Sequence, residues 1–213
     1  MKTAIVWDWD NTLMDTSEII YQAQRDLFLV YKKTDLPRAD AFRLMDKSAR
    51  DWMPGVFGTN WQEAYRFYLE RYAAHASQIR PKPFASEILE KARKMGFLSV
   101  VVSKKMRYII HREAQFFKLE NELTRIVGSG DAREDKPSVV AIKTALEGLD
   151  IDQIIVIGDA EVDMKMAKEA GAVSILLRKK EPQPGEFADG LIDYYAPDLK
   201  AAWKILQTIK KVD

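Results

Sequence analysis

The sequence of 213 residues contains no cysteine, and this absence excludes several kinds of chemistry. Disulfide bonds, thiol nucleophiles, Cys-ligated zinc and Cys-ligated iron–sulfur clusters all require cysteine. Only two histidines occur, His75 and His111, and they lie too far apart for a paired-histidine metal motif. A metal site in this chain therefore has to be built from carboxylates, which favours a hard cation such as Mg²⁺.

The sequence also lacks an excess of charge of either sign. Lysine and arginine together number 33, aspartate and glutamate 32, and the formal net charge is +1. Proteins that bind nucleic acids or membrane surfaces usually carry a basic excess, so we expect neither partner.

Long hydrophobic runs are missing as well. No stretch approaches the ~20 apolar residues that a membrane-spanning helix needs, and the apolar run at residues 4–7 is far too short for a signal peptide. We therefore expect a cytoplasmic protein. We also expect it to act as a monomer or a weak dimer.

The chain shows two kinds of hydrophobic pattern, one of which is inserted within the other. In residues 1–14 and 82–213, short apolar runs typical of buried parallel strands are separated by helical patterns. This order predicts an α/β fold, a Rossmann-like, doubly wound parallel sheet. Residues 15–81 carry only helical patterns, which indicates an all-helical cap domain inserted after the first strand.

Two local features shape our prediction for the inserted domain. One helix is expected around residues 42–49, and it should end before Pro54-Gly55 because both residues disfavour helix interiors. A later helix carries a stripe of aromatic residues at helical spacing, which predicts the core of this domain. The stripe consists of Trp61, Tyr65, Tyr68 and Tyr72.

Polar residues follow the predicted strands at the points where the strands end. Asp8 and Asp10 follow the first strand, Ser103 and Lys104 the second, and Asp159 the fourth. In open α/β sheets, ligands bind beyond the carboxyl ends of the strands. We therefore expect these side chains to gather at one edge of the sheet.

The residue types at this edge suit phosphoryl transfer. Asp8 and Asp10 are two positions apart, so one carboxylate can attack while the other handles a proton. Clustered acids repel one another and need a cation to stay ionised, and Asp159 adds another hard oxygen ligand beside Asp8. Ser103 and Lys136 can supply hydrogen-bond donors and positive charge to a phosphoryl group.

Four ordered motifs in this chain resemble those of the haloacid dehalogenase superfamily. They are Asp8-x-Asp10-x-Thr12-Leu13, Ser103, Lys136-Pro137 and Gly158-Asp159-x-x-x-Asp163. The helical insertion after the first motif resembles the cap of the phosphoglycolate phosphatase-like branch. Asn11 stands where glycine is commonest, although asparagine tolerates left-handed backbone well. Dehalogenases of the superfamily lack the second acid of the first motif, so Asp10 favours phosphate chemistry.

The resemblance implies roles for the acids. Asp8 is the expected nucleophile, which forms an aspartyl-phosphate. Asp10 is the expected acid–base, which protonates the leaving group and then activates water. Mg²⁺ is the expected cofactor, held by Asp8, the backbone carbonyl of Asp10 and Asp159, with Asp163 as a ligand or a supporting partner.

The resemblance also implies contacts with the substrate. Ser103 and Lys136 are expected to bind the phosphoryl group. Lys104 stands where the family often has asparagine, and Arg50 lies near a turn of the cap that can face the active site in the family. We regard Arg50 and Lys104 as candidates for binding the rest of the substrate, for example a second anionic group.

These expectations predict a Mg²⁺-dependent phosphatase that acts on a small-molecule phosphate monoester, with a phosphoglycolate phosphatase-like activity as the leading specific hypothesis. One alternative is a phosphotransferase of the same superfamily, such as a sugar phosphomutase, in which phospho-Asp8 passes its group to a hydroxyl. A remote alternative is a non-catalytic, receiver-like signalling domain phosphorylated on Asp8.

Overall fold

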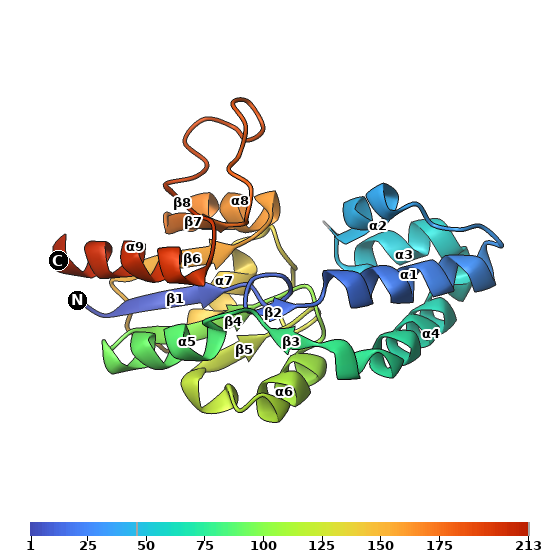
Figure 1. Cartoon of the computed structure of the whole chain (residues 1–213), viewed down its shortest axis with the longest axis horizontal. Coiled ribbons are helices and arrows are strands. Elements are labelled where there is room, and N and C mark those ends of the chain that lie inside the picture. The colour runs from blue at the N-terminus through green and yellow to red at the C-terminus, as the bar shows by residue number, and fades with distance from the viewer. Residues whose placement is uncertain (46, 213) are drawn as a thin grey trace. The chain divides into compact units, whose positions relative to one another are not determined.

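The computed structural model describes residues 1–45 and 47–212, and the chain divides into two compact units (Figure 1). The first, here called the α/β unit, comprises Met1–Met14 and Pro81–Asp213. The second, the helical unit, comprises Asp15–Arg80. Where the chain passes between them, β2 (Met14–Asp15) and β3 (Arg80–Pro81) form a small two-stranded sheet.

Among the described residues of the α/β unit, six strands form one sheet in the order β5-β4-β1-β6-β7-β8. All neighbouring strands are parallel, and Val6 pairs with Val100 on one side and with Val156 on the other. The strands are β1 (Thr3–Trp7), β4 (Leu98–Val102), β5 (Arg125–Val127), β6 (Gln153–Gly158), β7 (Val173–Leu177) and β8 (Tyr194–Ala196). The predicted α/β fold with a parallel sheet is confirmed. The edge strand β8 was not predicted, because it is short and two of its three residues, Tyr194 and Tyr195, are not buried, so it lacks the apolar run of the other strands.

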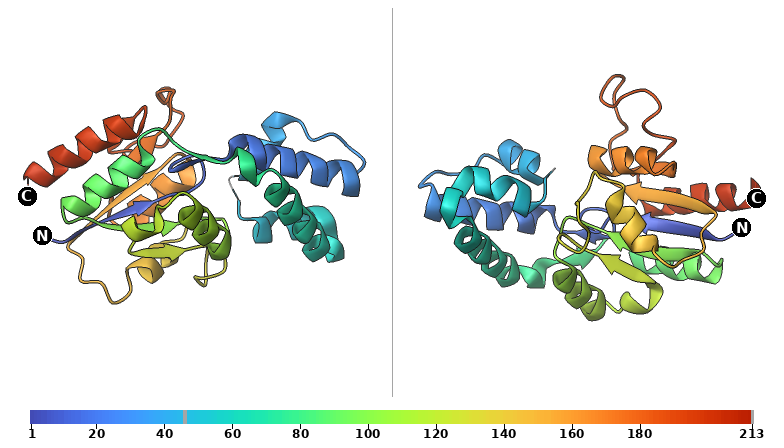
Figure 2. Two further views of the ribbon diagram at one scale, coloured as in Figure 1. Left: turned by 60° about the horizontal axis from the view of Figure 1, so that its bottom comes forward. Right: turned by 180° about the vertical axis from the view of Figure 1, so that it is seen from behind.

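Helices cover both faces of this sheet (Figure 2). They are α5 (Ala85–Lys94), α6 (Arg107–Phe116), α7 (Val140–Leu146), α8 (Glu161–Glu169) and α9 (Leu199–Val212), with a short η3 (Glu120–Glu122). Helices α5 and α9 contact each other, whereas α7 and α8 share a core cluster with alternate strand residues such as Val100 and Val156. Among the helices that the structure describes, none combines the length and apolar character needed to cross a membrane.

Strand β1 occupies the point where the winding of the sheet reverses. The connection from β1 leads through the helical unit and α5 to β4 on one side, while β6 lies on the other side. Connections that diverge from a central strand leave an opening beyond the carboxyl ends of the strands. The loop after β1 therefore starts at the position where ligands of such folds bind.

The helical unit buries an aromatic core of its own. Its elements are α1 (Ser17–Tyr31), α2 (Arg38–Met45), α3 (Ala49–Phe57), η1 (Gly58–Asn60), α4 (Trp61–Ala74) and η2 (Ala76–Gln78). Leu27, Trp52, Met53 and Ala64 are buried together, and Trp61, Tyr65 and Tyr68 pack against them. Tyr72 is also buried. The aromatic stripe is thus part of this core, as predicted.

The prediction of a helix that ends before Pro54-Gly55 was wrong. The helical segment breaks earlier, and α3 runs from Ala49 through Pro54 to Phe57. Proline costs the helix one backbone hydrogen bond, but α3 buries Trp52 and Met53, and this apolar burial offsets the loss. The helix then ends at Gly58, whose N–H donates to the Pro54 carbonyl and whose φ of +58° suits glycine.

Candidate active site

The ends of the central strands bring the predicted acids together. The Asp8 N–H donates to the Ile157 carbonyl at 2.9 Å, so the ladder between β1 and β6 continues one residue beyond β1. Asp159 directly follows β6, and Asp163 lies in the first turn of α8. Asp8, Asp159 and Asp163 each offer one carboxylate oxygen, and these three oxygens lie within 4.8 Å of one another.

A buried lysine stands among these acids. Lys136 Nζ lies 2.6 Å from Asp8 Oδ1 and 2.7 Å from Asp163 Oδ1, and its side chain is 1% exposed. The neighbouring Asp135 instead accepts hydrogen bonds from Ser129 Oγ and from a backbone N–H. Lys136 is therefore part of the acidic site and does not form a surface pair with Asp135. We call Asp8, Lys136, Asp159 and Asp163 the Lys136 cluster.

A glycine makes room for one member of the Lys136 cluster. A Cβ atom at Gly158 would lie 2.3 Å from the carboxylate of Asp163, so only glycine allows this close approach. The second oxygen of Asp163, Oδ2, accepts a hydrogen bond from the Ala160 N–H at 3.1 Å. The two bonds, to Lys136 and to the backbone, fix the Asp163 carboxylate.

The Lys136 cluster holds more negative than positive charge. The pKa of Asp8 is raised to about 6: burial contributes most, the Lys136 ammonium only partly opposes it, and the charges of Asp163 and Asp10 add to the rise. Burial, followed by the charge of Asp8, raises the pKa of Asp159 well above its usual range. Burial lowers the pKa of Lys136, but the neighbouring carboxylates outweigh it and raise that pKa overall. A surplus of hard oxygen ligands fits a divalent cation such as Mg²⁺.

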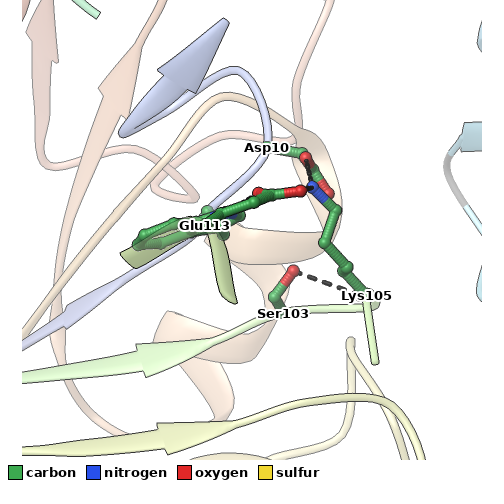
Figure 3. A network of polar contacts seen from close by, with 5 residues as sticks. Asp10, Ser103, Lys105 and Glu113 are labelled. Atoms are coloured by element: carbon green, nitrogen blue, oxygen red, sulfur yellow. Dashed lines mark hydrogen bonds and ion pairs between the residues drawn. The ribbon is translucent and has the colours of Figure 1, made fainter. Parts of the chain in front are cut away.

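The loop after β1 turns tightly. The Leu13 N–H donates to the Trp9 carbonyl at 3.0 Å, and the Asn11 N–H donates to the Met14 carbonyl at 2.7 Å. Asn11 has a φ of +63°, which fits the tolerance of asparagine for left-handed backbone. This turn sends the side chains of Trp9 and Asp10 toward α6 and the segment after β4 (Figure 3).

Asp10 belongs to a second polar network, which the sequence did not predict. Lys105 Nζ lies 2.5 Å from Asp10 Oδ1 and 3.1 Å from Glu113 Oε2, and Trp9 Nε1 donates to the same Glu113 oxygen at 2.6 Å. Figure 3 shows the Asp10 and Glu113 carboxylates converging on the Lys105 ammonium. Burial lowers the pKa of Lys105, but the two carboxylates outweigh it and raise the pKa. We call Trp9, Asp10, Lys105 and Glu113 the Lys105 cluster.

The remaining predicted residues occupy different settings. Ser103 is buried at the end of β4, and its Oγ accepts a hydrogen bond from the Lys105 N–H at 3.2 Å. Lys104 is half-buried, and its charge counteracts the rise in the pKa of Asp159. Arg50 lies in α3 of the helical unit, and its role in substrate binding stays a prediction.

Glu113 carries a signal that sequence analysis could have used. In α6, the buried positions are Ile110, Glu113 and Ala114, so an acid stands on the apolar face of an amphipathic helix. Buried acids are rare unless they are paired. A charged residue at such a position therefore indicates a partner elsewhere, although the pattern alone does not identify Lys105.

The chain as a whole resembles known proteins in sequence and in fold. The family model described as "Haloacid dehalogenase-like hydrolase" matches residues 5–177. The chain is 25% identical to "Putative pyrophosphatase PpaX" of Caldanaerobacter subterraneus subsp. tengcongensis, across 99% of this chain and 96% of that protein. It is 24% identical to a phosphoglycolate phosphatase of Aquifex aeolicus, across 81% and 83% of the two chains. The fold also matches the crystal structure of CbbY from Rhodobacter sphaeroides in complex with phosphate, with a TM-score of 0.79, 20% identity, and coverage of 93% and 95%.

Proposed function

The chain belongs to the haloacid dehalogenase-like hydrolase family, and on this basis we propose that it is a phosphatase that hydrolyses a small-molecule phosphate monoester through an aspartyl-phosphate on Asp8. One observation carries the proposal: at the switch point of the sheet, Asp8 and Asp163 bond the buried Lys136 ammonium, and a carboxylate oxygen of Asp159 lies within 4.8 Å of theirs. Phosphoryl transfer needs an in-line nucleophile, a bound cation and donors to the phosphoryl oxygens. The Lys136 cluster offers groups for each of these tasks.

In the proposed first step, a carboxylate oxygen of Asp8 forms a bond to phosphorus while the bond to the ester oxygen breaks. Asp10 gives its proton to the departing oxygen, so the alcohol leaves as a neutral molecule. In the second step, Asp10 takes a proton from water, and the water oxygen bonds to phosphorus as the acyl phosphate breaks. Inorganic phosphate leaves, and the Asp8 carboxylate is restored.

The cation and the phosphoryl group require separate ligands. We assign the carboxylates of Asp8 and Asp159 and the backbone carbonyl of Asp10 to Mg²⁺, which when bound supplies positive charge to the phosphoryl oxygens. Asp163 bonds Lys136 and a backbone N–H, so we assign to it the task of holding Lys136. Lys136 and the Ser103 hydroxyl then donate hydrogen bonds to the phosphoryl oxygens.

The relatives suggest which substrates to test. Pyrophosphate and 2-phosphoglycolate follow from their names, and both compounds carry a second anionic group beside the phosphoryl group that reacts. Lys104 and Arg50 are our candidates for binding that second group. Membership of a hydrolase family supports water as the acceptor, and it favours an enzyme over a receiver-like domain.

The test is a screen of the purified protein against these two compounds, several sugar phosphates and an aryl phosphate, with Mg²⁺. We expect each ester to give equal amounts of phosphate and alcohol, pyrophosphate to give phosphate alone, and a phosphoryl group to be trapped on the peptide that contains Asp8. Asp8→Asn should remove turnover. Glu122→Gln is the matched control, because Glu122 belongs to neither cluster and forms an ion pair of 2.7 Å with the exposed Arg93 side chain. Activity retained in Asp8→Asn would overturn the proposal, and transfer to a sugar hydroxyl would favour a phosphotransferase.

A further inference from the structure

We propose that Lys105 is a positioning residue for Asp10: its ammonium, anchored by Glu113, which in turn accepts from Trp9, holds the Asp10 carboxylate in place for proton transfer. This inference rests on the proposed function, because Asp10 is the acid–base only in that reaction. A closed ring of polar contacts through Asp10, Lys105, Glu113 and Trp9 carries the inference, and Lys136 is not a member of this ring.

The ring starts and ends on neighbouring residues of one loop. Asp10 Oδ1 accepts from Lys105 Nζ at 2.5 Å, and that ammonium also donates to the two Glu113 oxygens at 3.2 and 3.1 Å. Glu113 Oε2 then accepts from Trp9 Nε1 at 2.6 Å. Because Trp9 and Asp10 are consecutive, the contacts close a ring through α6 and the segment after β4 (Figure 3). Hydrogen bonds between charged groups are short and strong, so the ring restrains the Asp10 carboxylate.

The backbone of Lys105 is fixed as firmly as its ammonium. The Lys105 carbonyl accepts from the Ser129 N–H at 2.9 Å, and the Lys105 N–H donates to Ser103 Oγ at 3.2 Å. A Cβ atom at Gly128 would lie 2.5 Å from the Lys105 carbonyl oxygen, so the end of β5 packs directly against this backbone. Both the backbone and the ammonium of Lys105 are therefore held in defined positions.

The side chains that anchor the ammonium are more deeply buried than the carboxylate that it holds. The side chains of Lys105 and Glu113 are each 7% exposed, whereas that of Asp10 is 20% exposed. Without the lysine, the Asp10 carboxylate has water as an alternative partner and further rotamers to occupy. Misplacing a catalytic group by about 1 Å can cost ~10²-fold in rate. A side chain that fixes this carboxylate therefore contributes to catalysis without touching the substrate.

The first experiment compares leaving groups. The kcat/KM value covers the steps up to release of the alcohol, where an alkyl phosphate needs the acid and an activated aryl phosphate scarcely needs it. In Lys105→Met, we expect kcat/KM to fall by up to ~10²-fold for the alkyl ester and by less than ~3-fold for the aryl ester. The control Glu122→Gln should change neither value. Equal losses for both esters would overturn the positioning role, because a general structural defect affects both alike.

The second experiment is a double-mutant cycle with Asp10→Asn. If Lys105 acts through Asp10, Lys105→Met should cause no further loss of alkyl ester activity in the Asp10→Asn background, and multiplied losses would overturn the inference. The variant Lys105→Met/Glu113→Gln removes one charge of each sign, so it keeps the buried charges balanced if the single variant folds poorly. It should show the same selective loss of alkyl activity. Activity that survives in Asp8→Asn would instead overturn the proposed function, which distinguishes the two failures.

Discussion

Two lysines of the α/β unit, both with buried side chains, each join an acid of the loop after β1 to an acid on a flanking helix. The joined acids are Asp8 and Asp163 of α8 for Lys136, and Asp10 and Glu113 of α6 for Lys105. The two clusters differ in their surplus of charge. The Lys136 cluster contains a third acid, Asp159, whereas the Lys105 cluster is completed by the neutral N–H of Trp9.

This difference indicates different tasks for similar contacts. The Lys136 cluster holds three carboxylates and one buried lysine, and burial together with Asp163 raises the pKa of Asp8 to about 6. Such a site gains from an added cation, whereas two carboxylates around one lysine are closer to balance. We infer that the first cluster binds ligands and that the second holds one carboxylate still.

The largest expected effect is the loss of all turnover when the metal is removed. EDTA should abolish activity and Mg²⁺ should restore it, because the proposed nucleophile lies among carboxylates that need a cation. The two clusters should respond differently: Asp159→Asn should weaken Mg²⁺ binding measured by calorimetry, whereas Glu113→Gln should leave it unchanged. Full activity in excess chelator, or equal losses of Mg²⁺ affinity in the two variants, would contradict this division.

The second largest expected effect distinguishes the role of Asp10 from that of Asp8 in the two steps of the reaction. Asp10→Asn should slow alkyl ester hydrolysis by ~10²–10⁴-fold, which is the usual contribution of general acid–base catalysis. Activated aryl esters should still phosphorylate Asp8, so the phosphoenzyme should accumulate and appear as a product burst on rapid mixing. The measured mass shift should lie on the peptide that contains Asp8. Wild-type rates with both esters would show that Asp10 is not the acid–base.

The Lys136 cluster could be anticipated from the sequence because each of its members stands at a recognisable place. Asp8 and Asp159 directly follow apolar strands, and Lys136 precedes Pro137 before a helix. In a parallel sheet, strand order and direction then bring such residues to one edge. The apolar strands likewise predicted most of the fold, apart from the three-residue β8 and the course of the helix around Pro54.

The Lys105 cluster could not be anticipated in the same way, because its contacts depend on side-chain placement. Lys105 follows another lysine, and only the turn after β4 decides which of the two points toward Asp10. The sequence predicts only that Trp9 is a buried aromatic residue, and it does not show that the indole N–H donates to Glu113. Sequence spacing predicts which residues share a strand end, whereas hydrogen-bond partners across elements need coordinates.

A smaller effect should appear in stability without metal. The pKa of Asp8 rises from 3.8 to about 6 on folding, so the folded protein binds this proton more tightly than the unfolded chain. Stability therefore falls as pH rises through this range, and ionised Asp8 costs on the order of 2–3 kcal/mol above it. Asp8→Asn avoids that cost. In EDTA it should be more stable than wild type at pH 8, measured by urea unfolding, with the difference vanishing below about pH 4.

The matched variant in the other cluster is Asp10→Asn. It removes one of the two acids that bond Lys105, so it should gain no stability at pH 8. A loss of stability in Asp8→Asn at this pH would show that the bond to Lys136 outweighs the burial of the charge.

The smallest effect compares the helix acids of the two clusters. In Glu113→Gln, the amide oxygen can take the place of Oε2 and still accept from Trp9 and Lys105, so of these three contacts the one that is lost is the longest, 3.2 Å from Lys105 to Oε1. A hydrogen bond of ~1 kcal/mol corresponds to about fivefold in rate, and we expect the alkyl ester rate to fall by this amount. Asp163→Asn has no such solution. Its two oxygens accept from different donors, Lys136 and a backbone N–H, so the amide NH₂ must face one of them.

We therefore expect Asp163→Asn to lose more activity and more stability than Glu113→Gln, measured by ester hydrolysis and by urea unfolding. A buried donor that loses its acceptor costs about 1–3 kcal/mol, and more where the donor is charged. If Glu113→Gln proves as damaging as Asp163→Asn, the charge of Glu113 and not its geometry anchors Lys105. The two clusters would then depend on charge in the same way, and the distinction between a cluster that binds ligands and one that holds a carboxylate would have to rest on Asp159 alone.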